Sequence, residues 1–364
     1  MSTPIVTEQP VVVTGASGFI AAHLVKELLE RGYRVRGTVR GGAEKYPFLT
    51  GLPGAPARLE LVNADLTTEG AFDEVVRGAE IVMHTASPYA LDVKDPQRDL
   101  VDPAVKGTTS VLESCRKAGT VKRVVLTSSM AAITDEPDSD HVYTEADWNE
   151  RSSLDRNPYY YSKALAERAG WSFVEEKKPG FDLVVVNPFL VIGPSLSKAV
   201  NPSNQVFVDV LAGTYPGILS VAWGFVDVRD VAHAHVLAME TPGANGRNLC
   251  ANATLSMREV VEMMRKHGYE EGDKLPSMDL ACKLGDFAIK LGSYFQPKGI
   301  GSYLRTHIGK VPRFDHGKIT RELGLSFRPI EQSVVDTLAD LEKWGHIAPR
   351  KATATAGSGS RATA

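Results

Sequence analysis

The chain has little of what would tie it to a disulfide framework, a metal cluster or a membrane. Only three of its 364 residues are cysteines, and Cys115, Cys250 and Cys282 lie far apart. An odd number of separated cysteines forms no metal-ligand spacing and favours a reduced compartment. No apolar run approaches the roughly 18–20 residues that span a bilayer, and the first ten residues do not resemble a secretory signal. We therefore expect a soluble, cytoplasmic protein.

Charge of one sign is also scarce. Lysine and arginine number 41 against 44 acidic residues, a net charge of −3, and the basic residues form no run. This balance gives no reason to expect a nucleic-acid or membrane partner. The apolar content of 43% is that of an ordinary globular protein with a large core. We expect a small-molecule substrate as the partner, and either a monomer or a homodimer.

Short β-branched runs alternate with helical stretches through the first half of the chain. The expected strands and helices are 11–14, 19–31 (helix), 34–39, 59–63, 69–77 (helix), 81–85, 96–118 (helix), 123–128, 159–176 (helix) and 182–187. Strict alternation with strands apolar on both faces predicts an α/β fold with a parallel sheet covered by helices on both sides.

The pattern changes after Gly193. Loops lengthen, proline and glycine recur, and helical segments follow at 257–266 and 278–291. We expect a flexible start at 1–10, a sheet domain at 11–193 to which 224–242 returns, a mainly ligand-binding lobe at 194–350 and a disordered tail at 351–364. Ligands of such sheets bind at the carboxyl ends of the strands, where the lobe would pack.

A glycine-rich turn joins the first strand to the first helix, with the sequence VVTGASGFIA at 12–21. Gly15 would allow the tight turn, and Gly18 would let the backbone approach a pyrophosphate at the helix N-terminus. Ala21 takes the third small position. The alternative is an ordinary tight turn, but the strand and helix on either side favour a doubly wound, Rossmann-type dinucleotide site.

The end of the second strand indicates which dinucleotide binds. A site for NAD would place an acidic residue there for the ribose 2′-hydroxyl, whereas residues 34–40 read RVRGTVR. The fork of an arginine suits a 2′-phosphate, so we expect NADP(H), with Arg40 as the main contact and Lys45 or Arg36 as helpers. The alternative is that these arginines only solvate a strand end. Asp65, followed by Leu66, is a candidate acceptor for the adenine amino group, or else a helix cap.

The segment NPYYYSKALAE at 157–167 carries the strongest chemical signal. Tyr159 and Lys163 are four residues apart and share one face of the expected helix. A nearby cation lowers the pKa of a phenol and makes it a better proton donor near neutral pH. The spacing alone usually reflects packing, but a Thr-Ser-Ser at 127–129 follows a buried strand about thirty residues upstream.

Together these motifs resemble the extended short-chain dehydrogenase/reductase family. Within it, the likeness is to the dihydroflavonol reductase, cinnamoyl-CoA reductase and yeast methylglyoxal reductase group. It covers residues 11–350 and rests on TGASGFI (14–20), HTASP (84–88), VVLTSS (124–129), Tyr159 to Lys163, NP with VIGP (187–194) and VDVRDVA (226–232). Two departures are Ala21 in place of a third glycine and a short, acidic segment between Ser129 and Tyr159.

The resemblance implies roles for particular residues. The catalytic residues would be Ser129, rather than Ser128, with Tyr159 and Lys163. The cofactor would be held by Gly15, Ser17, Gly18, Phe19, Ile20, Arg40, Lys45, Asp65, Leu66, Thr85, Ser87, Tyr159, Lys163, Pro188, Val191 and Ser203.

The chemistry that this arrangement implies is reversible hydride transfer between a nicotinamide and a carbonyl carbon, with Tyr159 as the proton donor. Tyr89, Met130, Phe189 and Phe207 are candidates for the substrate wall, each equally consistent with plain core. If they line the site, the substrate is an aldehyde or ketone with a hydrophobic or aromatic body.

Two other functions stay open at this point. One is a nucleotide-sugar epimerase or dehydratase that recycles a tightly held NAD, and the other is a binding protein that senses a dinucleotide without catalysis. A metal site is not expected, because His233 and His235 lie two positions apart and would face different directions on a helix. The sequence also contains no Gly-x-Ser-x-Gly elbow of a hydrolase.

Overall fold

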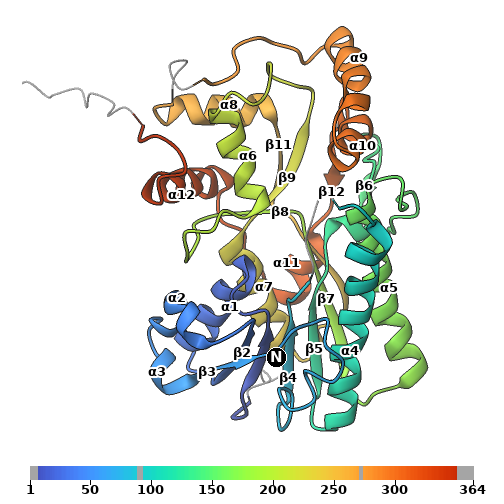
Figure 1. Cartoon of the computed structure of the whole chain (residues 1–364), viewed down its shortest axis with the longest axis vertical. Helices are drawn as coiled ribbons and strands as arrows, with labels where there is room; N and C mark the ends of the chain where they lie inside the picture. Colours follow the sequence, from blue (N-terminus) through green and yellow to red (C-terminus); the bar gives the residue numbers. More distant parts are fainter. Residues whose placement is uncertain (1–6, 88–92, 270–273, 351–364) are drawn as a thin grey trace, which may run out of the picture.

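The computed structural model describes residues 7–87, 93–269 and 274–350. It shows a sheet with helices on its faces below a second lobe (Figure 1). The first six residues of the expected flexible start, the expected tail at 351–364 and the candidate Tyr89 lie outside the described residues. No helix in the described ranges is long and apolar enough to cross a membrane.

The main sheet has seven strands, all parallel to their neighbours. They are β1 (Val11–Thr14), β2 (Val35–Val39), β3 (Leu59–Asn63), β4 (Ile81–His84), β5 (Arg123–Thr127), β7 (Asp182–Pro188) and β10 (Gly246–Cys250). Their order is β10-β7-β5-β4-β1-β2-β3, so the chain builds outward from β1 in one direction and then in the other. The expected α/β parallel sheet is confirmed, and its switch point lies beside β1.

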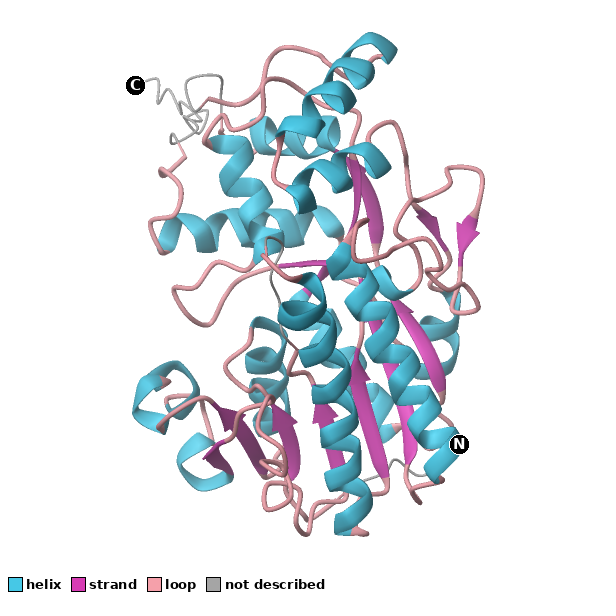
Figure 2. Cartoon of the chain, turned by 45° about the vertical axis from the view of Figure 1, so that its right-hand side comes forward, coloured by secondary structure: helices cyan, strands magenta, loops and turns pink. Residues whose placement is uncertain are grey.

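Successive side chains of β1 pack into two separate cores, one on each face of the sheet, because neighbours in a strand point to opposite faces. Val11 and Val13 pack with one set of helices and Val12 with the other. The first set is α1 (Phe19–Glu30), α7 (Val228–Glu240) and α11 (Gly317–Leu323), and the second is α4 (Asp102–Ala118) and α5 (Pro158–Lys177). Figure 2 shows helices layered over the strands in this way. The short helices α2 (Pro47–Thr50) and α3 (Ala55–Arg58) connect β2 to β3.

The second lobe lies beyond the carboxyl ends of these strands (Figure 1). Its sheet joins β8 (Leu190–Ile192), β9 (Ala222–Asp227) and β11 (Ala253–Ser256). Its helices are α6 (Pro202–Leu211), α8 (Met257–Lys266), α9 (Lys283–Gly292), α10 (Lys298–His307) and α12 (Ile330–Lys343). Phe207, Phe225 and Tyr269 are fully or almost fully buried at its centre. A small ladder of β6 (Val142–Tyr143) and β12 (Arg313–Phe314) lies beside it.

Two expected helices differ in the structure. Residues 69–77 form successive turns, because Gly70 adopts a left-handed φ of 71° and the Asp73 carboxylate accepts a hydrogen bond from Ser114 of α4. The helix expected from 278 begins only at Lys283, because the backbone of Leu280 pairs with Ile218 instead. The strand β10, which falls in the stretch assigned mainly to the lobe, pairs with β7 in the main sheet.

Candidate active site

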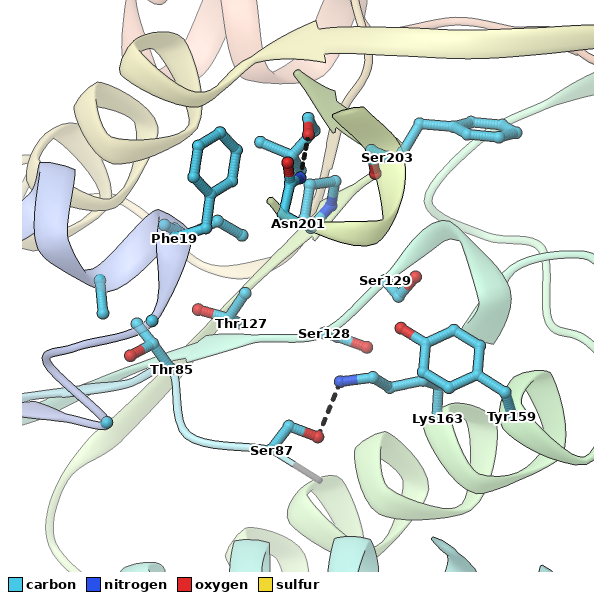
Figure 3. A pocket seen from close by; sticks show the side chains of 17 residues that line it. Phe19, Thr85, Ser87, Thr127, Ser128, Ser129, Tyr159, Lys163, Asn201 and Ser203 are labelled. Carbon is cyan, nitrogen blue, oxygen red and sulfur yellow. Dashed lines mark hydrogen bonds between the residues drawn. The ribbon is translucent and has the colours of Figure 1, made fainter. Parts of the chain in front are cut away.

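A cavity of about 260 Å³ opens where the main sheet meets the lobe. Figure 3 shows its lining side chains, which come from the glycine turn and the start of α1, the ends of β4 and β5, helix α5, the β7–β8 segment and the start of α6. The residues that line it are Gly15, Gly18, Phe19, Ile20, Ala21, Thr85, Ser87, Thr127, Ser128, Ser129, Tyr159, Lys163, Pro188, Phe189, Val191, Asn201 and Ser203. Ser17 lines an adjoining hollow together with Gly18 and Phe19.

The glycine turn forms one end of this cavity. Gly15 has a φ of 66°, and a Cβ there would lie 3.1 Å from atoms of Ala86. Gly18 precedes the first residue of α1 and brings no side chain to cap that helix. The helix N-terminus therefore faces the cavity as a site suited to an anion. These features fit the pyrophosphate of a dinucleotide, as the sequence predicts.

The residues expected at the adenosine end lie outside the cavity wall. Arg40 follows β2 and is exposed. The pKa of Asp65 lies below its usual value mainly because its carboxylate accepts two hydrogen bonds from Thr67, and the positive charge of Arg40 also lowers it. Lys45 lies against Gly41, and Leu66 packs against Gly107 of α4. Their roles toward a 2′-phosphate and an adenine stay predictions.

Arg36 does not fit the helper role considered for it. Its guanidinium pairs with Glu60 at 2.8 Å and donates to the carbonyls of Val75 and Arg77. Because these contacts occupy the Nε and Nη1 atoms of Arg36, Arg40 and Lys45 are the better candidates.

Tyr159 and Lys163 lie one turn apart on α5 and both line the cavity. The Lys163 Nζ atom is 5.9 Å from the centre of the Tyr159 ring and donates a hydrogen bond to Ser87 at 2.9 Å. Burial lowers the pKa of Lys163 to about 8, and the negative charge of Glu167 opposes that shift. The ammonium is thus a buried cation beside the phenol (Figure 3).

The two serines after β5 differ in their hydrogen bonds. The buried Ser128 hydroxyl donates to the Glu167 carboxylate at 2.5 Å. The Ser129 oxygen accepts from the backbone of Ala131 at 3.1 Å, which leaves its proton for another acceptor. The geometry therefore favours Ser129 over Ser128 as the hydroxyl that binds a substrate oxygen.

The three described candidates for the substrate wall differ in whether they line the cavity. Phe189 lines the cavity and its ring lies 5.8 Å from that of Phe314. Phe207 does not line it, because its side chain is fully buried in the lobe against Phe225. Met130 is also buried, in a small core with Leu249.

Sequence reasoning gave no role to several residues of the site. Asn201 lines the cavity, donates to the Val191 carbonyl at 2.8 Å and caps α6. Its position before Pro202 is the pattern of a helix start and could have been noticed. Thr38 accepts the Gly15 amide at 2.9 Å, but nothing in the sequence marks this contact across two strands.

The two histidines considered for a metal have other partners. His233 pairs with Glu27 at 2.7 Å, and the buried His235 hydrogen-bonds Thr127 at 2.6 Å. Within residues 7–87, 93–269 and 274–350, no three His, Cys, Asp or Glu side chains gather as a metal site would require.

The fold and the cavity define a Rossmann-type dinucleotide-binding protein with a tyrosine-lysine pair beside the ligand site. The profile of the NAD dependent epimerase/dehydratase family matches residues 11–252. The chain belongs to this family, which confirms the resemblance to the extended short-chain dehydrogenases/reductases seen in the sequence.

Individual relatives are reductases. The chain is 40% identical over 345 residues to cinnamoyl-CoA reductase CAD2 of Medicago truncatula, covering 92% of this chain and 95% of that protein. It is 43% identical over 289 residues to tetraketide alpha-pyrone reductase 2 of Arabidopsis thaliana, covering 73% and 88%. Among solved structures, yeast methylglyoxal/isovaleraldehyde reductase Gre2 with NADPH matches with a TM-score of 0.73 and 31% identity, covering 92% and 99%.

Proposed function

We propose that this protein is an NADPH-dependent carbonyl reductase that converts a hydrophobic or aromatic ketone or aldehyde to an alcohol. The observation that carries the proposal is the convergence of Ser129, Tyr159 and Lys163 on the cavity that the glycine turn also lines. A dinucleotide bound at the turn would extend past Thr85 and Ser87 toward these three side chains. The names of the relatives, all reductases of carbonyl compounds, support the same class of reaction.

Each residue of the site would have a separate role in the reaction. NADPH held by the glycine turn and Lys163 would supply the hydride chemistry of the reaction. Ser129 donates a hydrogen bond to the carbonyl oxygen and holds it beside Tyr159. As the π electrons of the C=O bond move to that oxygen, Tyr159 gives it a proton. Lys163 would hold the ribose hydroxyls and stabilise the phenolate, which would then be reprotonated from solvent.

The apolar side of the cavity supports the substrate class. Pro188, Phe189 and Val191 present apolar surface there, while Ser129 and Tyr159 present the hydroxyls. A pocket with an apolar body and a few convergent polar groups suits a carbonyl compound with a hydrophobic or aromatic group. The reduced, cytoplasmic setting and the monomer or homodimer remain predictions from the sequence.

The test is the loss of absorbance at 340 nm with NADPH, and separately with NADH, against an aromatic aldehyde, an α-diketone, a β-keto ester and a dihydroflavonol. We expect turnover with NADPH well above NADH. No turnover with any carbonyl, combined with NAD retained through purification, would instead support an epimerase-type enzyme.

A further inference from the structure

The Glu167 carboxylate lies fully buried directly behind the candidate catalytic residues. It is four residues after Lys163 and eight after Tyr159, so the three side chains follow one face of α5. Four side chains from different elements donate hydrogen bonds to it. They are Ser128 after β5 (2.5 Å), Asn187 of β7 (2.7 Å), Arg247 of β10 (2.6 Å) and Trp171 of α5 (3.2 Å).

The positive charge of Arg247 offsets the free-energy cost of burying the Glu167 carboxylate. Its guanidinium also donates to the carbonyls of Glu145, Asp147 and Ala132, and it stacks on Trp148 with its central carbon 3.9 Å from the ring centre. A buried charge is stable only when it is paired and hydrogen-bonded. This pair is both, and its carboxylate is bonded to Ser128 and Asn187 at the carboxyl ends of β5 and β7, where the cavity opens.

Through these contacts Glu167 connects the turn after β5 to α5, the helix that carries Tyr159 and Lys163. Ser128 is bonded to it directly, and Asn187 bridges from the carboxylate to the Ser129 carbonyl at 3.4 Å. Although Ser128 also lines the cavity, its hydroxyl proton is thereby committed to Glu167. Ser129, the next residue, keeps its hydroxyl at the cavity.

The same carboxylate is an anion close to the Lys163 ammonium. The ionisable groups that face Lys163 are Glu167 and Tyr159 of its own helix and His84 at the end of β4. Burial lowers the pKa of His84 to about 3, so this histidine adds no charge near neutral pH. Arg247 reaches the carboxylate from its other side.

We propose that Glu167 is a positioning residue of this site, which holds Ser129 in register with Tyr159 and keeps Lys163 in its charged form. The proposal rests on the reductase function proposed above. It assigns Glu167 two separable effects, one of position through Ser128 and Asn187 and one of charge on Lys163.

The main test is Glu167→Gln, which keeps the shape of the side chain and removes its charge. We expect kcat to fall by about 10- to 100-fold, the size of a lost hydrogen bond to a charged group, with little change in NADPH affinity. In the direction of reduction, we expect kcat to decline at high pH as Lys163 loses its proton. Without the anion this decline should move to lower pH by about half a unit or more.

A matched control is available at the other end of the same strands. Asp182 begins β7 and pairs with the buried Arg123 of β5 at 2.8 Å. Asp182→Asn also deprives a buried arginine of its carboxylate, but far from the cavity. It should lower the melting temperature and leave kcat and its pH profile at the wild-type values.

Two further variants separate position from charge and apply even if Glu167→Gln does not fold. Glu167→Asp keeps the charge but shortens its reach to Ser128, so kcat should fall without a shift of the high-pH decline. Ser128→Ala should lower kcat by a smaller factor than Ser129→Ala, because the Ser128 hydroxyl faces Glu167 rather than substrate.

Three results would overturn the proposal. One is a folded Glu167→Gln enzyme with wild-type kcat and pH profile. Another is a loss of kcat that Asp182→Asn reproduces at equal loss of thermal stability. The third is a Ser128→Ala variant as impaired as Ser129→Ala. A wild-type enzyme that reduces no carbonyl would instead contradict the proposed function.

Discussion

The two walls of the cavity are built in different ways. On the dinucleotide side, the Gly15 and Ala16 amides donate to the side chain and carbonyl of Thr38, and Thr14 hydrogen-bonds the buried His84. On the proposed substrate side, the Phe189 ring packs against Phe314, a residue far along the sequence from it.

The two walls differ in the amino-acid substitutions that they can accept. The first wall is backbone locked into the parallel sheet, where an added methyl group at Gly15 would meet both a left-handed φ and Ala86. The second wall includes the side chain of Phe189, which packs against Phe314 and which a single substitution can reshape. We therefore expect substitutions at Phe189 to change substrate preference, and substitutions at the glycine turn to impair cofactor binding.

The largest effect should come from the residue proposed as the proton donor, which lies on α5 and belongs to neither of these two walls. Tyr159→Phe removes the proposed proton donor and should lower kcat by about 100- to 10,000-fold, while NADPH affinity, followed by fluorescence titration, changes little. The control is Tyr161→Phe in the same helix turn, which should keep near wild-type activity. Equal losses in the two variants would refute the assignment of Tyr159.

The next effect concerns the cofactor. Arg40→Ala should reduce the preference for NADPH over NADH in kcat/KM by about 10- to 100-fold, since it removes a charged contact to the 2′-phosphate. Arg36→Ala, whose side chain pairs with Glu60, should leave the ratio unchanged. An unchanged ratio in Arg40→Ala would show that the phosphate site lies elsewhere.

A smaller change is expected from the adaptable wall. Phe189→Ala should raise kcat/KM for a bulky aromatic ketone relative to a small diketone by about tenfold, through added space. Phe207→Leu, in the core of the lobe, should lower thermal stability without altering that ratio. The division between walls would fail if Phe189→Ala changed cofactor affinity more than substrate choice.

The same division explains what could be predicted from the sequence. The glycine turn, Tyr159 and Lys163 are local patterns whose spacing fixes their geometry, and the structure brings them to one cavity. Glu167 stands in the same pattern at the next turn, but its partners Asn187 and Arg247 come from two later strands. No short-range pattern predicts such long-range pairing, and for the same reason the sequence could not tell Phe189 from Phe207.

The smallest effect near neutral pH is on folding stability, and it comes from four buried histidines. Burial lowers the pKa of His84 to about 3, and of His23, His235 and His307 to about 4. The unfolded chain, with histidine pKa values near 6.5, therefore binds more protons as the pH falls from about 6.5 to about 4. Stability should be full above pH 6.5 and decline below it.

Thermal melts between pH 7.5 and 5 would measure this decline, which we expect to amount to several degrees. His307→Gln, at the end of α10 in the lobe, should make the slope shallower than in the wild-type protein. A melting temperature that stays constant down to pH 5 would mean that these histidines are not held neutral.

The central claim, hydride transfer to a carbonyl carbon, can be tested directly with NADPH that carries deuterium at both C4 positions. After reduction of an aromatic aldehyde or ketone, mass spectrometry and NMR would locate the label. The account predicts one deuterium on the carbinol carbon of the product alcohol. An alcohol without deuterium at that carbon, or no alcohol from any carbonyl offered, would contradict it.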